Sequence, residues 1–143
     1  MARPIRSGRA VTGRAALRGF TLIEIMIVMT IISILISVAV PMYQKAILRA
    51  KESLLRNNLF TLRTVIDEYT YDKQKAPQSL QYLVSEGYLR DVPMDPITGS
   101  NGTWKVIMED ATSTVNQTEP GIWDVRSGSD KTSPLDGTLY GDW

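Results

Sequence analysis

One acidic side chain, Glu24, stands at the start of a long apolar run, and its chemistry needs an explanation. The 20 residues that follow it, 25–44, carry no charged side chain. A lone ionised carboxylate in hydrocarbon costs several kcal/mol, so an acid in such a segment needs a cation at the same depth. A cut between Gly19 and Phe20 would create an α-amino group able to serve as that cation. We therefore take Glu24 as the leading functional residue.

Enzymatic chemistry has few residues to use, because the chain contains neither Cys nor His. The commonest general base and the thiol nucleophile are therefore both missing. The remaining candidate sets are Asp67 with Glu68, Asp91 with Asp95, and Ser127 or Ser129 with Lys131. Neighbours on a helix point in different directions, acids beside prolines are typical of turns, and the third set has no supporting motif. We expect no enzyme.

The charge of the chain is divided along its length. Residues 1–19 contain five arginines and no acid, and the rest carries 11 basic against 15 acidic side chains, a balance of −4. A basic tail could bind nucleic acid. Directly before an apolar segment, however, a basic stretch is typical of a topology signal that stays in the cytoplasm. We expect no nucleic-acid partner.

The apolar segment is long enough to cross a membrane. Its 20 residues would span about 30 Å as a helix, the thickness of the hydrocarbon layer. A cleaved secretory signal is the alternative, with Val38-Ala39-Val40 as a possible cleavage site. Its length, the presence of Glu24 and a helical pattern beyond Pro41 argue against this alternative. Pro41 should kink or loosen the helix.

A stripe of apolar residues follows Pro41. Its last five members are separated by 4, 3, 4 and 3 positions, which predicts a helix with one buried face. The stripe consists of Ile47, Leu54, Leu55, Leu59, Leu62, Ile66 and Tyr69. Charged residues lie mostly on the other side, with Glu52 and Arg56 as an i,i+4 pair. We predict one helix over residues 20–71; a soluble coiled coil is the competing interpretation.

The remaining residues predict a small head of mixed structure. Ala76-Pro77 should begin a short helix that Gly87 ends. Residues 91–102 contain two prolines and two glycines and predict a loop with turns. Residues 104–108 and 122–126 read as antiparallel strands, joined by a polar surface loop over 109–121. The fold class is therefore α+β, with a long N-terminal helix packed on a small C-terminal head.

The motif Arg18-Gly19-Phe20-Thr21-Leu22-Ile23-Glu24 resembles the processing site of the type IV pilin superfamily. The closing residues, Gly141-Asp142-Trp143, resemble those of type II secretion major pseudopilins in particular. The resemblance implies cleavage after Gly19 by a prepilin peptidase and N-methylation of Phe20. It also implies that Glu24 pairs with the amino terminus of a neighbouring subunit.

The same resemblance implies a pilin-like fold in three parts. Residues 1–19 would be a basic leader, and residues 20–44 a transmembrane helix that becomes the filament core. Residues 45–143 would be a periplasmic amphipathic helix and globular head. In such filaments the helix often loosens near a proline, which the resemblance suggests for residues 38–43.

The C-terminal residues 127–143 combine three aspartates with hydroxyls and glycines. On composition alone they fit either an Asp-rich turn or an oxygen-ligand site for a hard cation. The resemblance implies a calcium loop. It indicates Asp130 and Asp136 as carboxylate ligands and Ser127 as a carbonyl or hydroxyl ligand, whereas Asp142 equally fits a cap of the terminus.

The function that the resemblance implies is that of a non-enzymatic subunit of a periplasmic pseudopilus. It would cross the bacterial inner membrane once, with a cytoplasmic leader and a periplasmic head, and help to drive folded proteins across the outer membrane. Its partners would be other copies, minor pseudopilins, the prepilin peptidase, an inner-membrane assembly platform and, before assembly, lipid. A type IV pilus subunit for adhesion or motility is the alternative, although many such pilins close a loop with a disulfide.

Overall fold

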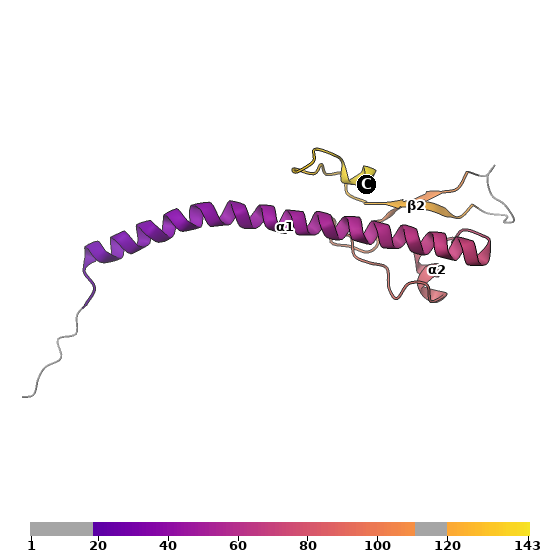
Figure 1. Ribbon diagram of the computed structural model, residues 1–143, viewed down its shortest axis with the longest axis horizontal. Coiled ribbons are helices and arrows are strands. Elements are labelled where there is room, and N and C mark those ends of the chain that lie inside the picture. Colours follow the sequence, from indigo (N-terminus) through magenta and orange to yellow (C-terminus); the bar gives the residue numbers. More distant parts are fainter. Residues whose placement is uncertain (1–18, 111–119) are drawn as a thin grey trace, which may run out of the picture. The chain divides into compact units, whose positions relative to one another are not determined.

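The computed structural model describes residues 19–110 and 120–143 (Figure 1). Its elements, in chain order, are α1 (Leu22–Lys73), α2 (Leu80–Ser85), β1 (Lys105–Met108), β2 (Ile122–Arg126) and the 3-10 turn η1 (Tyr140–Asp142). Contacts divide the chain into two units, Met1–Val40 and Pro41–Trp143. The second unit contains the predicted head, and we call this whole unit, Pro41–Trp143, the head. The predicted α+β class and pilin-like order of elements are confirmed.

The long helix α1 agrees with the prediction to within two residues at each end. Thr21 begins it, since its Oγ1 accepts the Glu24 N–H at 3.2 Å. Thr-x-x-Glu is the capping-box pattern, which satisfies a free N–H of the first turn. The helix continues through Pro41, so residues 38–43 are helical in the single chain. The loosening expected for a filament stays a prediction.

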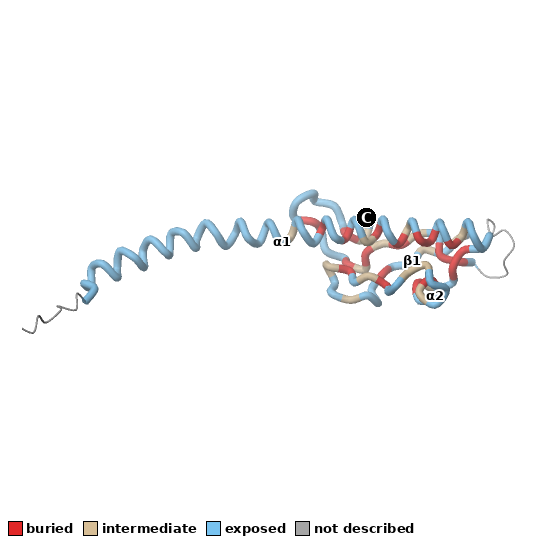
Figure 2. Tube along the Cα trace, turned by 60° about the horizontal axis from the view of Figure 1, so that its bottom comes forward, coloured by how far each residue is buried: buried red, intermediate tan, exposed pale blue. Residues whose placement is uncertain are grey.

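The core of the head is built on one face of α1. Leu55, Leu59, Leu62, Ile66 and Tyr69 are all buried, which confirms the 4, 3, 4, 3 spacing (Figure 2). Side chains from the rest of the head complete the core: Leu80, Leu83, Val92, Trp104, Ile122, Val125 and Tyr140.

Two members of the predicted stripe do not belong to this core. Ile47 and Leu54 are exposed, so the prediction was wrong for both. Leu54 lies one position off the line set by Leu55 and Leu59, which turns it about 100° away around the helix. Ile47 lies ahead of Glu52, the first buried residue of α1.

The short helix begins later than expected. Ser79 caps α2 by accepting the Tyr82 N–H at 3.1 Å, three residues beyond Ala76. Pro77 is instead buried, and its carbonyl accepts the Ile122 N–H of β2 at 2.8 Å. Gly87 ends the helix as predicted, in the left-handed conformation at φ 82°.

The two predicted strands form one antiparallel pair among the described residues. Lys105 faces Arg126 and Val106 faces Val125, and the register shifts between Ile107 and Met108. Of the predicted loop over 109–121, residues 111–119 lie outside the described residues. The chain leaves β2 directly into residues 127–143, which we call the C-terminal segment.

Candidate functional site

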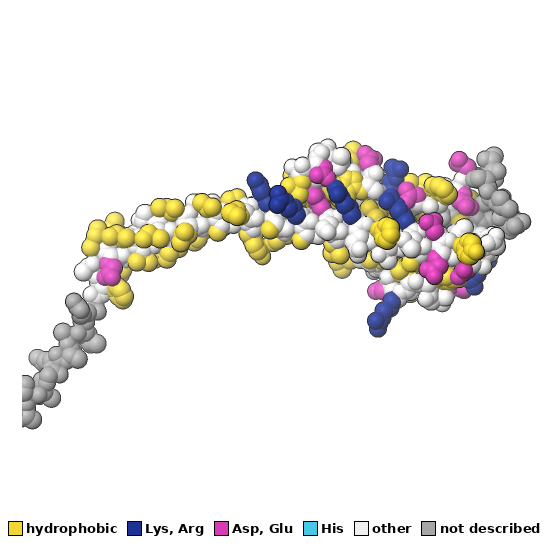
Figure 3. Space-filling model, in the orientation of Figure 1, with side chains coloured by type: hydrophobic (Ala, Val, Ile, Leu, Met, Phe, Trp, Pro, Cys, Tyr) yellow, Lys and Arg dark blue, Asp and Glu magenta, His cyan; other side chains and the backbone are white. Residues whose placement is uncertain are grey.

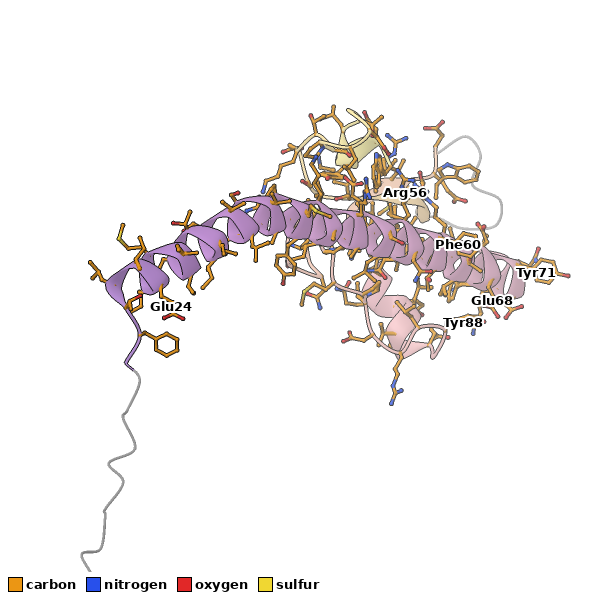
Figure 4. The ribbon with its side chains drawn as sticks, turned by 60° about the vertical axis from the view of Figure 1, so that its left-hand side comes forward. Glu24, Arg56, Phe60, Glu68, Tyr71 and Tyr88 are labelled. Carbon is orange, nitrogen blue, oxygen red and sulfur yellow. The ribbon has the colours of Figure 1, made fainter. Side chains whose placement is uncertain are left out.

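The first candidate site is the beginning of α1. Glu24 is exposed in its first turn (Figure 4). The helix is long and apolar enough to cross a membrane, and none of its most apolar 18-residue window is buried. Apolar side chains cover this part on the side shown in Figure 3. An apolar surface of this size, which nothing covers within the described residues, needs lipid or protein against it.

The residues around the predicted cleavage site show what the fold itself requires. Gly19 precedes the helix, and a Cβ added to it would meet no atom within 4 Å. The fold therefore gives no steric reason for glycine there. Glu24, by contrast, has a local role because its N–H binds the Thr21 hydroxyl. Because this contact uses the backbone, a substitution at position 24 leaves it in place and tests the side-chain charge.

The second candidate site lies where the C-terminal segment meets α1. Glu52 is only 5% exposed. Its Oε1 accepts the hydroxyl protons of Ser133 and Tyr140, both at 2.7 Å. The pKa of Tyr140 is raised above its ordinary value, mainly by burial and next by the hydrogen bond to Glu52. Glu52 thus attaches the C-terminal segment to α1 at two points, Ser133 and Tyr140.

Two arginines of α1 extend this attachment. An NH2 of Arg56 lies 2.5 Å from Asp136 Oδ2, and its guanidinium stacks 4.2 Å from the centroid of Trp143. Arg63 donates from Nε to Asp124 Oδ1 at 2.7 Å and from NH2 to the Trp143 carbonyl at 3.0 Å. The predicted pairing of Glu52 with Arg56 is therefore wrong, because each residue reaches across to the C-terminal segment instead.

The burial of Glu52 could have been predicted from the sequence. Glu52 precedes Leu55 by three residues, which extends the 3-and-4 spacing of the buried stripe by one step. A buried acid at the end of an apolar stripe indicates a polar partner. The partners of Arg56 and Arg63 lie 61 to 80 residues away, so no local pattern could reveal them.

The predicted calcium ligands do not come together. The Ser127 hydroxyl donates to Asp95 Oδ2 at 2.6 Å, and Asp130 Oδ1 binds Lys105 Nζ at 2.8 Å. The hydrogen bond and charge of Lys105 hold the pKa of Asp130 below its ordinary value. Asp136 pairs with the arginine already described. The described residues contain no group of three acidic side chains placed to share a metal ion, and the calcium site stays a prediction.

The sets weighed for catalysis have structural roles where they are seen. Asp67 and Glu68 are exposed on α1. Asp95 accepts the Ile97 and Thr98 N–H groups in a turn, at 2.8 and 3.3 Å. The Ser129 hydroxyl oxygen accepts the backbone N–H of Lys131 at 3.2 Å. None of these contacts is a nucleophile paired with a base.

Comparison with known proteins finds a family that shares the segment containing the first candidate site. Residues 15–40 match the family described as the prokaryotic N-terminal methylation motif. The chain is also 32% identical over 102 residues to the type II secretion system core protein G of Klebsiella michiganensis. That alignment covers 60% of this chain and 72% of the relative.

Two further relatives share mainly the N-terminal part. The type IV major fimbrial protein FimA of Dichelobacter nodosus is 43% identical over 61 residues, 43% of this chain, and the chain spans only 38% of its length. The competence protein ComGC of Halalkalibacterium halodurans is 39% identical over 71 residues, 50% of this chain and 70% of the relative. No solved structure matches the chain significantly.

Proposed function

Because the chain belongs to the family of type II secretion core protein G, within the type IV pilin superfamily, we propose that it is a structural, non-enzymatic subunit of a periplasmic pseudopilus. The observation that carries the proposal is the exposed apolar part of α1 with Glu24 at its start. Lipid of the inner membrane would cover this surface first, in a single pass with the leader cytoplasmic and the head periplasmic. Other copies would cover it after assembly.

Processing would create the working N-terminus. We place cleavage between Gly19 and Phe20 and methylation on the Phe20 amine, within the segment that matches the methylation motif. The open surroundings of Gly19 support this, because the requirement for a small residue then belongs to the peptidase. A larger residue at position 19 should slow cleavage without unfolding the protein.

Glu24 would set the register between copies. In the low dielectric of a helix bundle its carboxylate pairs with the Phe20 amino group of a neighbouring copy. Such a pair stabilises one register, because leaving either charge unpaired is costly. Contacts that repeat head-to-tail without closing produce a helical fibre.

A second contact between copies is supported by the outer face of α1 in the head, which we define as Arg49, Arg56, Phe60, Asp67 and Tyr71. Their spacing of 7, 4, 7 and 4 aligns them on one side of the helix. All five are exposed, Phe60 by 70% and Tyr71 by 80%, and Figure 4 labels Arg56, Phe60 and Tyr71 along α1.

Charge divides this face into two ends. Lys45, one turn before Arg49, adjoins it at the basic end, and Glu68 adjoins Asp67 at the acidic end. Within the residues that the structure describes, Lys45, Arg49, Asp67 and Glu68 form no ion pair. The basic end of one copy therefore complements the acidic end of another, and the exposed Phe60 ring lies between the two ends.

The spacing of the two ends fixes which copies can meet. Arg49 and Asp67 lie 18 residues apart, about 27 Å along the helix. The pairing of Glu24 with a neighbour's Phe20 shifts two copies by about four residues, or about 6 Å. The outer faces would therefore join copies several steps apart in a parallel stack and strengthen the fibre along its length.

The remaining partners follow from this role. The prepilin peptidase would act before assembly, an inner-membrane platform would add subunits, and minor pseudopilins would share the fibre. The fibre would help to drive folded proteins across the outer membrane. Growth by subunit addition requires no chemistry at the subunit itself.

A type IV pilus subunit is the second candidate, favoured by the identity to the fimbrial protein. The two candidates separate in a strain that lacks the gene. A pseudopilus subunit predicts the loss of a set of folded proteins from the culture supernatant and their retention in the periplasm, restored by the gene on a plasmid. An unchanged supernatant together with lost surface filaments or motility would assign the chain to a pilus.

A further inference from the structure

The acids of the C-terminal segment are matched by cations of the chain itself. Lys105 of β1 binds Asp130 at 2.8 Å, and Arg56 of α1 binds Asp136 at 2.5 Å. These two aspartates are the carboxylates that a calcium ion would need. Their charge is thus neutralised from two different elements of the head.

The hydroxyls of the segment are also engaged within the protein. Ser127 donates to the buried Asp95 and accepts the Ser129 N–H at 3.2 Å. Ser133 donates to Glu52 and accepts the N–H groups of Leu135 and Asp136, at 3.2 and 3.1 Å. The turns of the segment therefore hold their shape through internal hydrogen bonds.

The ammonium of Lys105 stands among oxygen atoms suited to a hard cation. A Cβ placed on Gly141 would lie 3.2 Å from the Ser129 carbonyl oxygen, 3.8 Å from that of Ser127 and 3.7 Å from Lys105 Nζ. Two carbonyls, an ammonium and the Asp130 carboxylate thus surround one small region. Carbonyl and carboxylate oxygens of this kind are calcium's preferred ligands.

We propose that the C-terminal segment is closed by Lys105 and Arg56 in place of a calcium ion, so that the head folds and stays folded without divalent metal. The ammonium is tethered to β1 and the guanidinium to α1, so both cations are present as soon as the core forms. The proposal is independent of whether the protein builds a pseudopilus or a pilus.

Thermal unfolding of the full-length chain in detergent micelles tests the proposal. All three tryptophans, Trp104, Trp123 and Trp143, lie in the head, so their fluorescence reports its unfolding alone. We expect the same Tm in excess chelator and in millimolar calcium chloride. Lys105→Met and Arg56→Met should each lower the Tm in both conditions.

Lys131→Met is the matched control, because Lys131 is an exposed lysine of the same segment that forms no ion pair within the described residues. It should leave the Tm unchanged. A rise in the wild-type Tm with calcium, or heat of binding on calorimetric titration with calcium chloride, would overturn the proposal even if a variant failed to fold. An unchanged Tm for Lys105→Met would overturn it as well.

Discussion

The backbone and the side chain of Glu24 have separate physical roles. Its backbone N–H closes the first turn of α1 on Thr21, and its carboxylate is the only charge at the start of the apolar part. A substitution at position 24 keeps the backbone N–H and changes only the side chain, and glutamine has nearly the shape of glutamate without its charge.

Glu24→Gln should therefore leave processing and membrane insertion intact and abolish assembly. Removing one partner of a buried ion pair costs about 3–5 kcal/mol, whereas Thr21→Ala removes a cap worth about 1 kcal/mol and should reduce assembly only mildly. Fibres sheared from cells and quantified against membrane-bound subunit give the comparison. Normal fibre yield from Glu24→Gln would exclude charge pairing as the register device.

Glu52 is the second residue whose surroundings decide its effect. Glu52→Ala leaves the hydroxyls of Ser133 and Tyr140 without their acceptor, and each unsatisfied buried group costs about 1–3 kcal/mol. Since 1 kcal/mol shifts the Tm of a domain of this size by roughly 4–8 °C, the Tm should fall by more than about 4 °C. Glu68→Ala, an exposed acid on the same helix, is the control and should show almost no change by tryptophan fluorescence.

Tyr140 should make the head sensitive to alkaline pH. Its raised pKa means that the folded head holds the phenol proton more tightly than the unfolded chain does. The resulting stability is complete below about pH 10, the ordinary pKa of tyrosine, and is lost as pH rises through the raised value. The free energy of unfolding of Tyr140→Phe should therefore fall less steeply than that of the wild type as pH rises above about 10. Equal slopes for both proteins in denaturant titrations would contradict this.

At the scale of elements, the sequence predicted whatever depends on local pattern. The spacing of Leu55, Leu59 and Leu62 predicted the buried face of α1, and both strands were found within the predicted residues 104–108 and 122–126. The start of α2 was misplaced because Pro77 serves a contact with β2 rather than a helix terminus. The pairings of Asp130 and Asp136 with Lys105 and Arg56 join distant segments, so neither the composition nor the resemblance could reveal them.

The two ends of the outer face of α1 allow a charge-swap experiment. Arg49→Glu or Asp67→Lys alone should place like charges opposite each other between copies and reduce fibre length and yield several-fold. The double variant restores opposite charges with the ends exchanged, so fibres should recover. Arg90→Glu, an exposed charge after α2, is the control; a double variant as defective as the single ones would exclude this contact.

At the scale of the whole molecule, two units share one helix but differ in what completes them. The head contains its own core and fastens its C-terminal segment to α1 with three charged side chains, Glu52, Arg56 and Arg63. The described part of the first unit, residues 19–40, has no buried residue. The head thus buries its apolar core by folding alone, whereas the apolar part of α1 needs lipid or other protein to cover it.

The division of contacts between Val40 and Pro41 has a consequence for how such proteins can be recombined. Residues 20–40 should be exchangeable between relatives. A chimaera that carries a relative's segment at these positions should keep the unfolding midpoint of the head. Only the ability of the chimaera to assemble with the relative's subunits should change. Residues 52–69 should not be transplantable, because they carry half of the head's core and the anchor for its last 17 residues. The sequences of the two parts of α1, before and after Pro41, would therefore diverge at different rates among relatives, although both parts belong to a single helix.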